Sequence, residues 1–265
     1  MTTITMRPVE PDKDFGQLAA WFTSIEDEAS TETSLKEYYQ RVQERVTAQV
    51  AVDDVGALEG FYWLSRHKFE AGRFDFSLFV PPERRGQGIG RRLYAELSAI
   101  PEVAQAKRLR VSVRDDSPAD RAFAERRGFH ILRHQFMMGL NLDTFDDQPY
   151  EAIIARLEGE GFRFTSMGAL GNTEEAQRKL YALNDSTSAS TPGTGGEHSW
   201  ESFEDFQKSV CQSDWYKPDG QIVVIDTTIG EWAAMSAITR LEGNDYAYNL
   251  FTGVDERYRG RKLGQ

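Results

Sequence analysis

The stretch Phe76-Ser-Leu-Phe-Val-Pro-Pro-Glu-Arg-Arg-Gly-Gln-Gly-Ile-Gly-Arg-Arg-Leu93 decides how the first half of this chain folds. It runs from an apolar strand through a glycine loop directly into a helix. Its three glycines, Gly86, Gly88 and Gly90, allow turn geometry and a close approach of the backbone to a ligand. The first amides of the helix have no acceptor inside it, and the helix dipole is positive at this end. The junction therefore predicts a site for a phosphate or pyrophosphate, with arginines beside it.

This loop differs from two common phosphate loops. It lacks the Lys-Ser/Thr ending of a nucleotide triphosphatase loop, and it lacks the Rossmann spacing of three glycines with two residues before the last. Glycines at alternate positions also fit a strand-to-helix turn that needs glycine for its geometry alone. These residues alone are compatible with both interpretations, an anion site and a simple strand-to-helix turn.

The order Val80-Pro-x-x-Arg-Arg85-Gly-x-Gly88-x-Gly90 resembles the acetyl-CoA pyrophosphate loop of the GCN5-related N-acetyltransferase (GNAT) superfamily. The loop of that family reads Arg/Gln-x-x-Gly-x-Gly/Ala, which Arg85, Gly88 and Gly90 match. The resemblance implies that the end of the strand lies beside the pantetheine arm and that the loop surrounds the pyrophosphate. The cofactor-binding residues that it implies are Leu78, Phe79, Val80, Arg85, Gly86, Gln87, Gly88, Ile89, Gly90 and Arg91.

The resemblance extends in element order over most of residues 3–142. It implies an α/β (α+β) fold with a central mixed, mostly antiparallel sheet flanked by helices. The capping-box spacing of Ser34 and Glu37 predicts the start of the second helix. The strands and helices expected in chain order are Ile4–Val9, Pro11–Ser24, Ser34–Arg45, Ala48–Val52, Leu58–Arg66, Phe74–Val80, Gly88–Ala99, Leu109–Val113, Ser117–Arg127 and closing strands within Phe129–Leu142.

The chain also resembles itself. Residues 48–56, AQVAVDDVG, line up with residues 222–230, IVVIDTTIG, at an offset of 174, and the same offset places Arg85 on Arg259 without a gap. An internal duplication predicts two tandem GNAT domains. We expect an acetyl-CoA-binding domain over 1–142, a connecting helix over 143–161 whose apolar stripe packs on a domain, and a second domain over 162–265.

The second domain departs from the first. Lys262 stands where the first domain has Gly88. A copy complete to its last strand would extend about 50 residues beyond Gln265, so we expect this domain to be truncated in its phosphate loop. Its loop resembles that of tandem members such as mycothiol synthase, in which one domain can be catalytic while its twin is not. The Ser/Thr/Gly-rich segment Asp185–Glu197 predicts a mobile surface loop, with a substrate lid as the alternative.

Catalysis is where the first domain departs from the family pattern. Many members carry Asn-x-x-Ala-x-x-x-Tyr-x-x-x-Gly-Phe, with the tyrosine close to the departing sulfur. Counting back from Gly128-Phe129, the tyrosine position is Ala124 and the asparagine position is Ser117. Alanine cannot donate a proton, so a non-catalytic acyl-CoA-binding module is the alternative to an enzyme. Base candidates are carboxylates near the strand edge, such as Asp75, for which a solvated strand residue is the more ordinary interpretation.

Composition limits the class of partner and the compartment. A net charge of −11 over 265 residues disfavours nucleic acid, because the average surface field repels phosphate. No apolar run reaches membrane length, and the N-terminus lacks the apolar core of a secretory signal, so the cytoplasm is expected. Cys211 is alone, and His130 and His134 lie in a strand region, so neither a disulfide nor a metal site is predicted. The expected activity is transfer of acetyl from acetyl-CoA to a primary amine of a small molecule, with a homodimer as one possible assembly.

Overall fold

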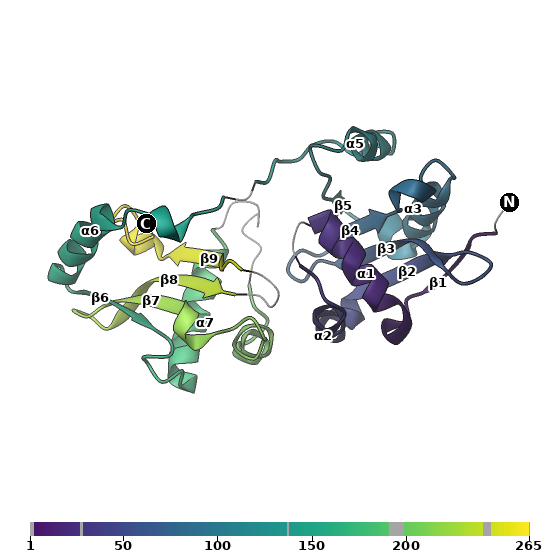
Figure 1. Cartoon of the computed structure of the whole chain (residues 1–265). Helices are drawn as coiled ribbons and strands as arrows, with labels where there is room; N and C mark the ends of the chain where they lie inside the picture. The colour runs from purple at the N-terminus through teal and green to yellow at the C-terminus, as the bar shows by residue number, and fades with distance from the viewer. Residues whose placement is uncertain (1–2, 27–28, 137, 191–198, 241–244, 265) are drawn as a thin grey trace. The chain divides into compact units, whose positions relative to one another are not determined.

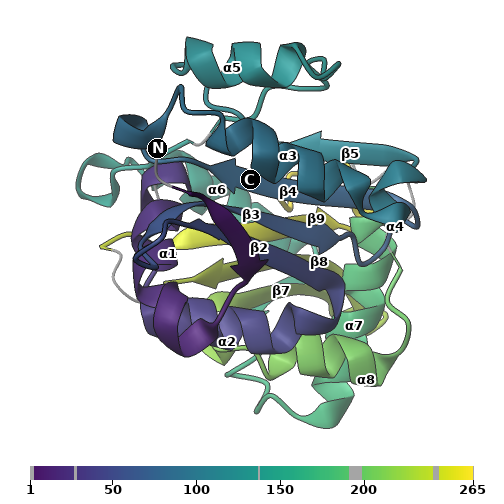
Figure 2. The same cartoon turned by 90° about the vertical axis from the view of Figure 1, so that its right-hand side faces the viewer.

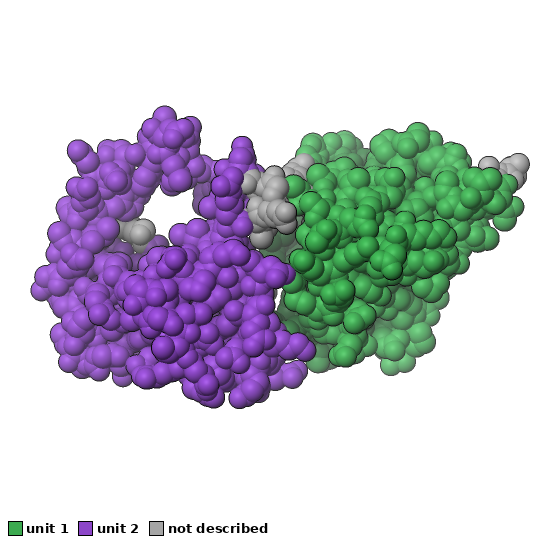
Figure 3. All heavy atoms as spheres, turned by 60° about the horizontal axis from the view of Figure 1, so that its bottom comes forward, with its two compact units in different colours: residues 1–137 green, residues 138–265 purple. Residues whose placement is uncertain are grey.

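The structure, a computed structural model, describes residues 3–26, 29–136, 138–190, 199–240 and 245–264. It divides into two compact units, residues 1–137 and residues 138–265, which Figure 3 shows in green and purple. Each unit has its own sheet. No helix in the part of the chain that the structure describes has the length and apolarity needed to cross a bilayer.

The first unit is built on a five-stranded sheet (Figure 1). Its strands are β1 (Thr5–Pro8), β2 (Val46–Val52), β3 (Leu58–Arg66), β4 (Arg73–Phe79) and β5 (Arg108–Val111). They lie in the order β1-β2-β3-β4-β5, and all neighbours are antiparallel except the parallel pair β4 and β5. The mixed, mostly antiparallel sheet expected from the sequence is therefore confirmed.

Helices cover both faces of this sheet (Figure 2). They are α1 (Pro11–Glu26), α2 (Glu32–Val42), α3 (Ile89–Ala99), α4 (Pro101–Ala104) and α5 (Pro118–Glu125). Because side chains alternate along a strand, Phe61 and Trp63 of β3 pack against α1 and α2, whereas Tyr62 and Leu64 pack against α3. The strand β3 is thus the centre of two cores.

The second unit has a four-stranded antiparallel sheet. Its strands are β6 (Phe162–Ser166), β7 (Gln221–Asp226), β8 (Glu231–Thr239) and β9 (Tyr248–Val254), and its helices are α6 (Gln148–Gly159), α7 (Glu174–Ser188) and α8 (Phe203–Phe206). The strands lie in the order β6-β7-β8-β9. Leu157 of α6 is buried against Phe162, so the helix expected as a connector packs into the core of this unit.

The start of α2 corrects one expectation. The helix begins after Thr31, whose side chain accepts from the Ser34 amide at 3.1 Å, while the Ser34 hydroxyl accepts from the Thr31 amide at 2.9 Å. Ser34 is therefore the last residue of a capping box rather than its first. Its hydroxyl takes the part that was assigned to Glu37.

The closing strands predicted within Phe129–Leu142 are wrong. The structure assigns no strand to residues 129–136 or 138–142 (Figure 1), and Phe136 and Met138 are 81% and 87% exposed. Apolar residues there mimic a strand, but a strand needs a partner edge for its backbone groups. The loop expected from Asp185 also starts late, because α7 continues to Ser188 and buries Thr187; the rest of that segment, residues 191–198, lies outside the described residues.

The internal repeat is real but contains one extra residue. The bulge in β2 falls between Ala51 and Val52, and the bulge in β7 falls between Val224 and Ile225, an offset of 173 rather than 174. Beyond the turn, β3 and β4 correspond to β8 and β9 at 174, since Phe61 pairs with Phe79 as Met235 pairs with Gly253. The ungapped alignment is therefore wrong by one residue in β7, and the turn before β8 accommodates the insertion.

Candidate functional site

The loop after β4 is a compact turn held by its own backbone. It begins with a 3-10 turn over Pro82–Arg84, in which the amide of Arg84 donates to the Pro81 carbonyl at 2.9 Å. Gly86 and Gly88 then adopt positive φ angles of 78° and 85°, which a residue with a Cβ rarely adopts. Gly88 is the N-cap of α3, so the loop delivers the chain directly into a helix.

A run of free amides lines this turn. The first hydrogen bond of α3 joins the Arg92 amide to the Gly88 carbonyl at 3.1 Å. Within the described residues, no backbone acceptor is recorded for the amides from Gly86 to Arg91. These donors lie at the positive end of an eleven-residue helix. This is the arrangement that binds a phosphate or pyrophosphate.

The glycines of the loop serve different purposes. A Cβ on Gly88 would meet only the end of the Arg91 side chain, at 3.5 Å, so this position leaves the backbone open to a ligand. A Cβ on Gly90 would lie 3.4 Å from the Phe123 ring and 3.7 Å from Val80. Gly90 therefore lets α3 pack closely against α5 and the end of β4.

Arg85 braces the loop. Its Nε donates to the Val80 carbonyl at 3.0 Å, and its Nη1 lies 3.5 Å from Oδ1 of Asp120 on α5. The guanidinium thus joins the end of β4 to α5 while staying partly exposed. It keeps positive charge beside the free amides, where an anion would be attracted.

An ion pair between a buried carboxylate and a partly exposed arginine anchors the loop to the sheet. Glu59 of β3 has a side chain only 6% exposed, and its carboxylate accepts hydrogen bonds from Nε and Nη2 of Arg84. This pairing raises the pKa of Arg84. This contact was not predicted from the sequence. The signal was present, because a carboxylate in an otherwise apolar strand needs a partner when it is buried.

The last residues of β4 have no strand beside them on the β5 side. The parallel pairing of β4 with β5 ends at Phe76 and Val111, although β4 continues to Phe79. Leu78 packs in the core under α3, and the ring of Phe79 lies 5.3 Å from that of Trp21. With both side chains held in the cores, the backbone of this edge is available to an extended ligand.

The helix predicted after β5 is present, and it carries alanine at the position of the family's acid. α5 begins after Ser117, whose hydroxyl donates to Asp120 at 2.6 Å, and it ends before Gly128, which has a φ of 85°. Ala124 lies on this helix and carries no polar side-chain atom. No proton can come from that position.

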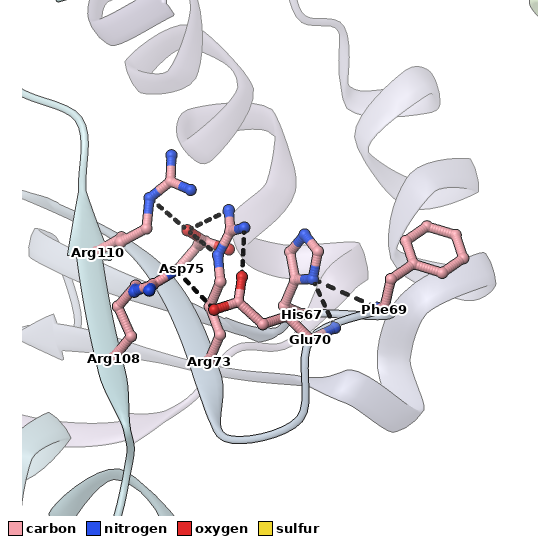
Figure 4. A network of polar contacts seen from close by, with 7 residues as sticks. All are labelled: His67, Phe69, Glu70, Arg73, Asp75, Arg108 and Arg110. Carbon is pink, nitrogen blue, oxygen red and sulfur yellow. Dashed lines mark hydrogen bonds and ion pairs between the residues drawn. The ribbon is translucent and has the colours of Figure 1, made fainter. Parts of the chain in front are cut away.

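Asp75 does not lie at the loop. It precedes Phe79 by four residues, or roughly 13 Å along an extended strand. Its Oδ1 accepts from Nε and Nη2 of Arg73 at 3.3 and 3.1 Å, and Nε of Arg110 is 3.5 Å away (Figure 4). Asp75 is part of an ion-pair network at the other end of β4, which argues against its role as the base.

The second unit repeats the turn with different side chains. Arg259 donates from Nε to the Val254 carbonyl at 3.4 Å, as Arg85 does to Val80. Gly260 and Lys262 take φ angles of 80° and 73°, the values of Gly86 and Gly88 within about ten degrees. Lys262 therefore holds a side chain where the first unit leaves the backbone bare.

Part of the first unit matches a model of a known protein family. Residues 44–131 match the model described as the acetyltransferase (GNAT) domain. That match spans β2 to α5 and includes the whole glycine loop. No curated protein matches the chain.

Solved structures match over nearly the whole chain. The region described as a GCN5-related glucosamine N-acetyltransferase in a fungal multi-domain β-N-acetylglucosaminidase gives a TM-score of 0.69 at 18% identity over 100% of this chain, which spans only 33% of that protein. A GCN5-related N-acetyltransferase from Sphaerobacter thermophilus gives 0.67 at 13% identity, covering 98% of this chain and 79% of that one. A tandem GNAT protein from the clavulanic acid biosynthesis pathway gives 0.66 at 19% identity, covering 99% and 82%. These likenesses establish the fold.

Proposed function

Because residues 44–131 form a domain of the GNAT acetyltransferase family, we propose that the first unit moves the acetyl group of acetyl-CoA to a primary amine of a small molecule. The family match and the fold support an acyltransferase, and acetyl-CoA as the donor and a primary amine as the acceptor belong to the proposal. The observation that carries it is the run of unpaired amides from Gly86 to Arg91 at the start of α3. We also propose a cytoplasmic location, and the homodimer stays a prediction.

The donor fits two adjacent features of the first unit. The pyrophosphate is bound by the amides of the loop, with positive charge from Arg85 nearby. The pantetheine arm lies along the unpaired edge of β4, where backbone groups of Leu78 and Phe79 face it. An amide near Phe79 or Val80 then polarises the thioester carbonyl, because a fixed donor stabilises the negative charge that develops on its oxygen.

Proton transfer is the weakest part of this site. The amine must be neutral to attack, and the departing thiolate must gain a proton. With Ala124 at the usual acid position, that proton comes from water or from the ammonium product. A thiol with a pKa near 8.5 leaves as a thiolate without great difficulty, whereas a placed general acid is worth about 10²–10⁴ in rate. We therefore propose a slow enzyme.

Ala124 also favours a second function. A unit that keeps the anion site but lacks the acid could serve as a non-catalytic acyl-CoA-binding module. Such a module would bind acetyl-CoA through the same amides and release no coenzyme A. The two functions share the ligand and differ only in turnover.

One experiment separates these functions. Coenzyme A release from acetyl-CoA is measured with a thiol reagent across small amines, using a Cys211→Ser background so that the protein adds no thiol signal. Release that requires both amine and protein, and that Gly88→Glu removes, supports the enzyme. Binding by calorimetry without release from any amine supports the module. Absence of acetyl-CoA binding to the folded chain would overturn both.

A further inference from the structure

A cluster of charged side chains lies on one face of β4 and β5, away from the glycine loop (Figure 4). Arg73 pairs with Arg108 across the two strands, and Asp75 pairs with Arg110, so all four side chains share a face. Glu70 and His67 join them from the turn before β4. The proposed chemistry uses none of these residues.

Part of this cluster has a structural role. Glu70 accepts from Nη1 of Arg73 at 3.1 Å and from Nη1 of Arg108 at 2.6 Å. The Arg73 side chain is only 10% exposed. These contacts tie the turn before β4 to β5, and they satisfy both oxygens of Glu70. They leave Arg110 without a comparable partner.

Arg110 is the unmatched member of the cluster. A guanidinium carries five N–H donors, yet the one recorded partner of Arg110 in the described chain is Oδ1 of Asp75, at 3.5 Å. That same oxygen already accepts twice from Arg73. The Arg110 side chain is 20% exposed, so its donors are accessible from solvent. A guanidinium whose donors are mostly not taken up by the protein can form charge-assisted, bidentate hydrogen bonds with an anion.

The cluster around Arg110 also carries a surplus of positive charge, which favours binding of an anion. Three guanidiniums, on Arg73, Arg108 and Arg110, face two carboxylates, on Glu70 and Asp75. The pKa of Arg110 is lowered by burial and then by the positive charge of Arg73, with a further contribution from Arg133. In a chain with a net charge of −11, this surplus of positive charge is a local exception.

The position of Arg110 fixes its relation to the reacting group. It lies level with Asp75, three residues before Leu78, which is roughly 10 Å along the strand at the usual rise of about 3.3 Å per residue. The unpaired edge of β4, where the acetyl group is proposed to lie, starts after Phe76, one residue beyond Asp75, which pairs with Arg110. A small molecule following β4 could reach both.

We propose that Arg110 binds a carboxylate or phosphate of the acceptor, which is therefore an amine with an anionic group about 10 Å from its nitrogen. The inference rests on the proposed acetyl transfer in the first unit. It names a substrate class and a specificity-determining residue. The anion takes the free donors of Arg110, while Asp75 keeps its two hydrogen bonds from Arg73.

A matched pair of acceptors tests this inference on the full chain. The molecule ω-aminooctanoate carries an amine and a carboxylate at opposite ends, and octylamine lacks the carboxylate. The parent protein is expected to show a kcat/KM at least about ten-fold higher for ω-aminooctanoate, mainly through KM, because a charge-assisted hydrogen bond acts on binding. Equal values for the two amines would overturn the proposal.

Variants then assign the preference to one side chain. Arg110→Gln is expected to lower kcat/KM for ω-aminooctanoate until the ten-fold preference over octylamine is lost, and Arg110→Lys is expected to restore part of that preference. Arg108→Gln is the matched control, since Arg108 is on the same strand and pairs with Glu70. A preference that survives in Arg110→Gln, or that Arg108→Gln removes equally, would contradict the assignment.

A binding measurement keeps the inference independent of turnover. Calorimetric titration of ω-aminooctanoate into the chain is expected to give a saturable site that Arg110→Gln weakens about ten-fold or more. Saturable, Arg110-dependent binding without acetyl transfer would refute the proposed activity and leave the anion site standing. Transfer without any Arg110 dependence would refute the anion site and leave the activity standing.

Discussion

The two glycine loops of this protein have nearly the same backbone and different side chains. Both follow a strand, pass through a 3-10 turn and place two residues at positive φ, Gly86 and Gly88 in the first unit and Gly260 and Lys262 in the second. In both turns the Nε of an arginine donates to a carbonyl at the end of the strand, Arg85 to Val80 and Arg259 to Val254, and a glycine at positive φ follows that arginine. The capacity to bind an anion depends on what stands at the next position. Gly88 has no side chain at this position, whereas Lys262 carries one.

The loops are also anchored by different forces. Arg84, which is partly exposed, ties the first loop to the buried carboxylate of Glu59 by an ion pair. At the matching place in the second unit, Tyr258 packs edge-on against Phe162 with ring centroids 5.9 Å apart, and its hydroxyl donates to Asp226 at 3.2 Å. The same geometry is therefore held by charge in one unit and by aromatic packing in the other.

The largest expected effect comes from adding a negative charge to each loop in turn. Gly88→Glu should lower acetyl-CoA affinity on the order of 100-fold or more, because the carboxylate repels the pyrophosphate and the Cβ is strained at this φ. Lys262→Glu should change the affinity by no more than about two-fold, because that loop takes no part in binding. Calorimetry on both variants makes the comparison.

The strain of the backbone needs its own control. Gly128→Glu places the same residue at a φ of 85° with open space around it, outside the loop. It should keep the parental affinity. A folded Gly88→Glu protein that binds as the parent does, or an equal loss in Lys262→Glu, would show that the site has been assigned to the wrong place.

The two anchors should differ in their contribution to stability. Arg84→Ala leaves the Glu59 carboxylate buried without its partner, so we expect the melting temperature of the first unit to fall by on the order of 5 °C or more. Tyr258→Phe loses only one hydrogen bond, and we expect a fall of about 3 °C or less in the second unit. Differential scanning calorimetry measures both.

A double variant sharpens this test. Replacing Glu59 and Arg84 together by glutamine removes the unpaired charge, so part of the stability lost in Arg84→Ala should return. If the single variants of the two units melt alike, the contrast between a charged and an aromatic anchor is wrong.

The smallest expected effect is a pH response confined to the first unit. Nδ1 of His67 accepts from the Phe69 and Glu70 amides at 3.3 and 3.0 Å, so the ring is neutral when the turn is formed. Burial, followed by the charge of Arg73, lowers the pKa of His67 in the folded state. The unfolded chain takes up a proton near pH 6.5, so this contribution to stability is present above about pH 6.5 and declines as the pH falls towards the folded pKa.

His67→Asn isolates that response. The Asn side chain keeps an acceptor for the amides but does not titrate. Between pH 7.5 and 5.5, conditions chosen to bracket a pKa of about 6.5, the first unit of the parent should lose a few degrees more in melting temperature than the variant does. If the melting temperatures of the two proteins depended on pH in the same way, His67 would not be the source of the pH response.

Local signals in the sequence were enough to predict most of the first unit. The strand, loop and helix around Gly88 are confirmed because glycine geometry and helix starts depend on neighbouring residues. The tandem arrangement of two similar units could also be predicted, since a repeat is visible in the sequence without any structure. The one-residue insertion in the second copy could not be predicted, because the pairing register of β7 is set by the strand beside it.

What failed depended on contacts between distant residues. The expected closing strands after Phe129 need an edge to pair with, which composition cannot supply. Asp75, a base candidate chosen as a carboxylate near the strand edge, stays a prediction, and the sequence did not show that it is paired with Arg73 and Arg110. The Glu59–Arg84 pair joins residues from β3 and the loop, so no local pattern could identify the partner.

The stoichiometry of acetyl-CoA binding tests the central claim most directly. Calorimetric titration of the 265-residue chain should give one saturable site, since the first loop leaves a bare backbone at Gly88 ahead of α3, whereas the second loop carries the Lys262 side chain at the matching position. The Gly88→Glu variant should give none. Two saturable sites of similar affinity, or a single site that survives Gly88→Glu, would contradict the account.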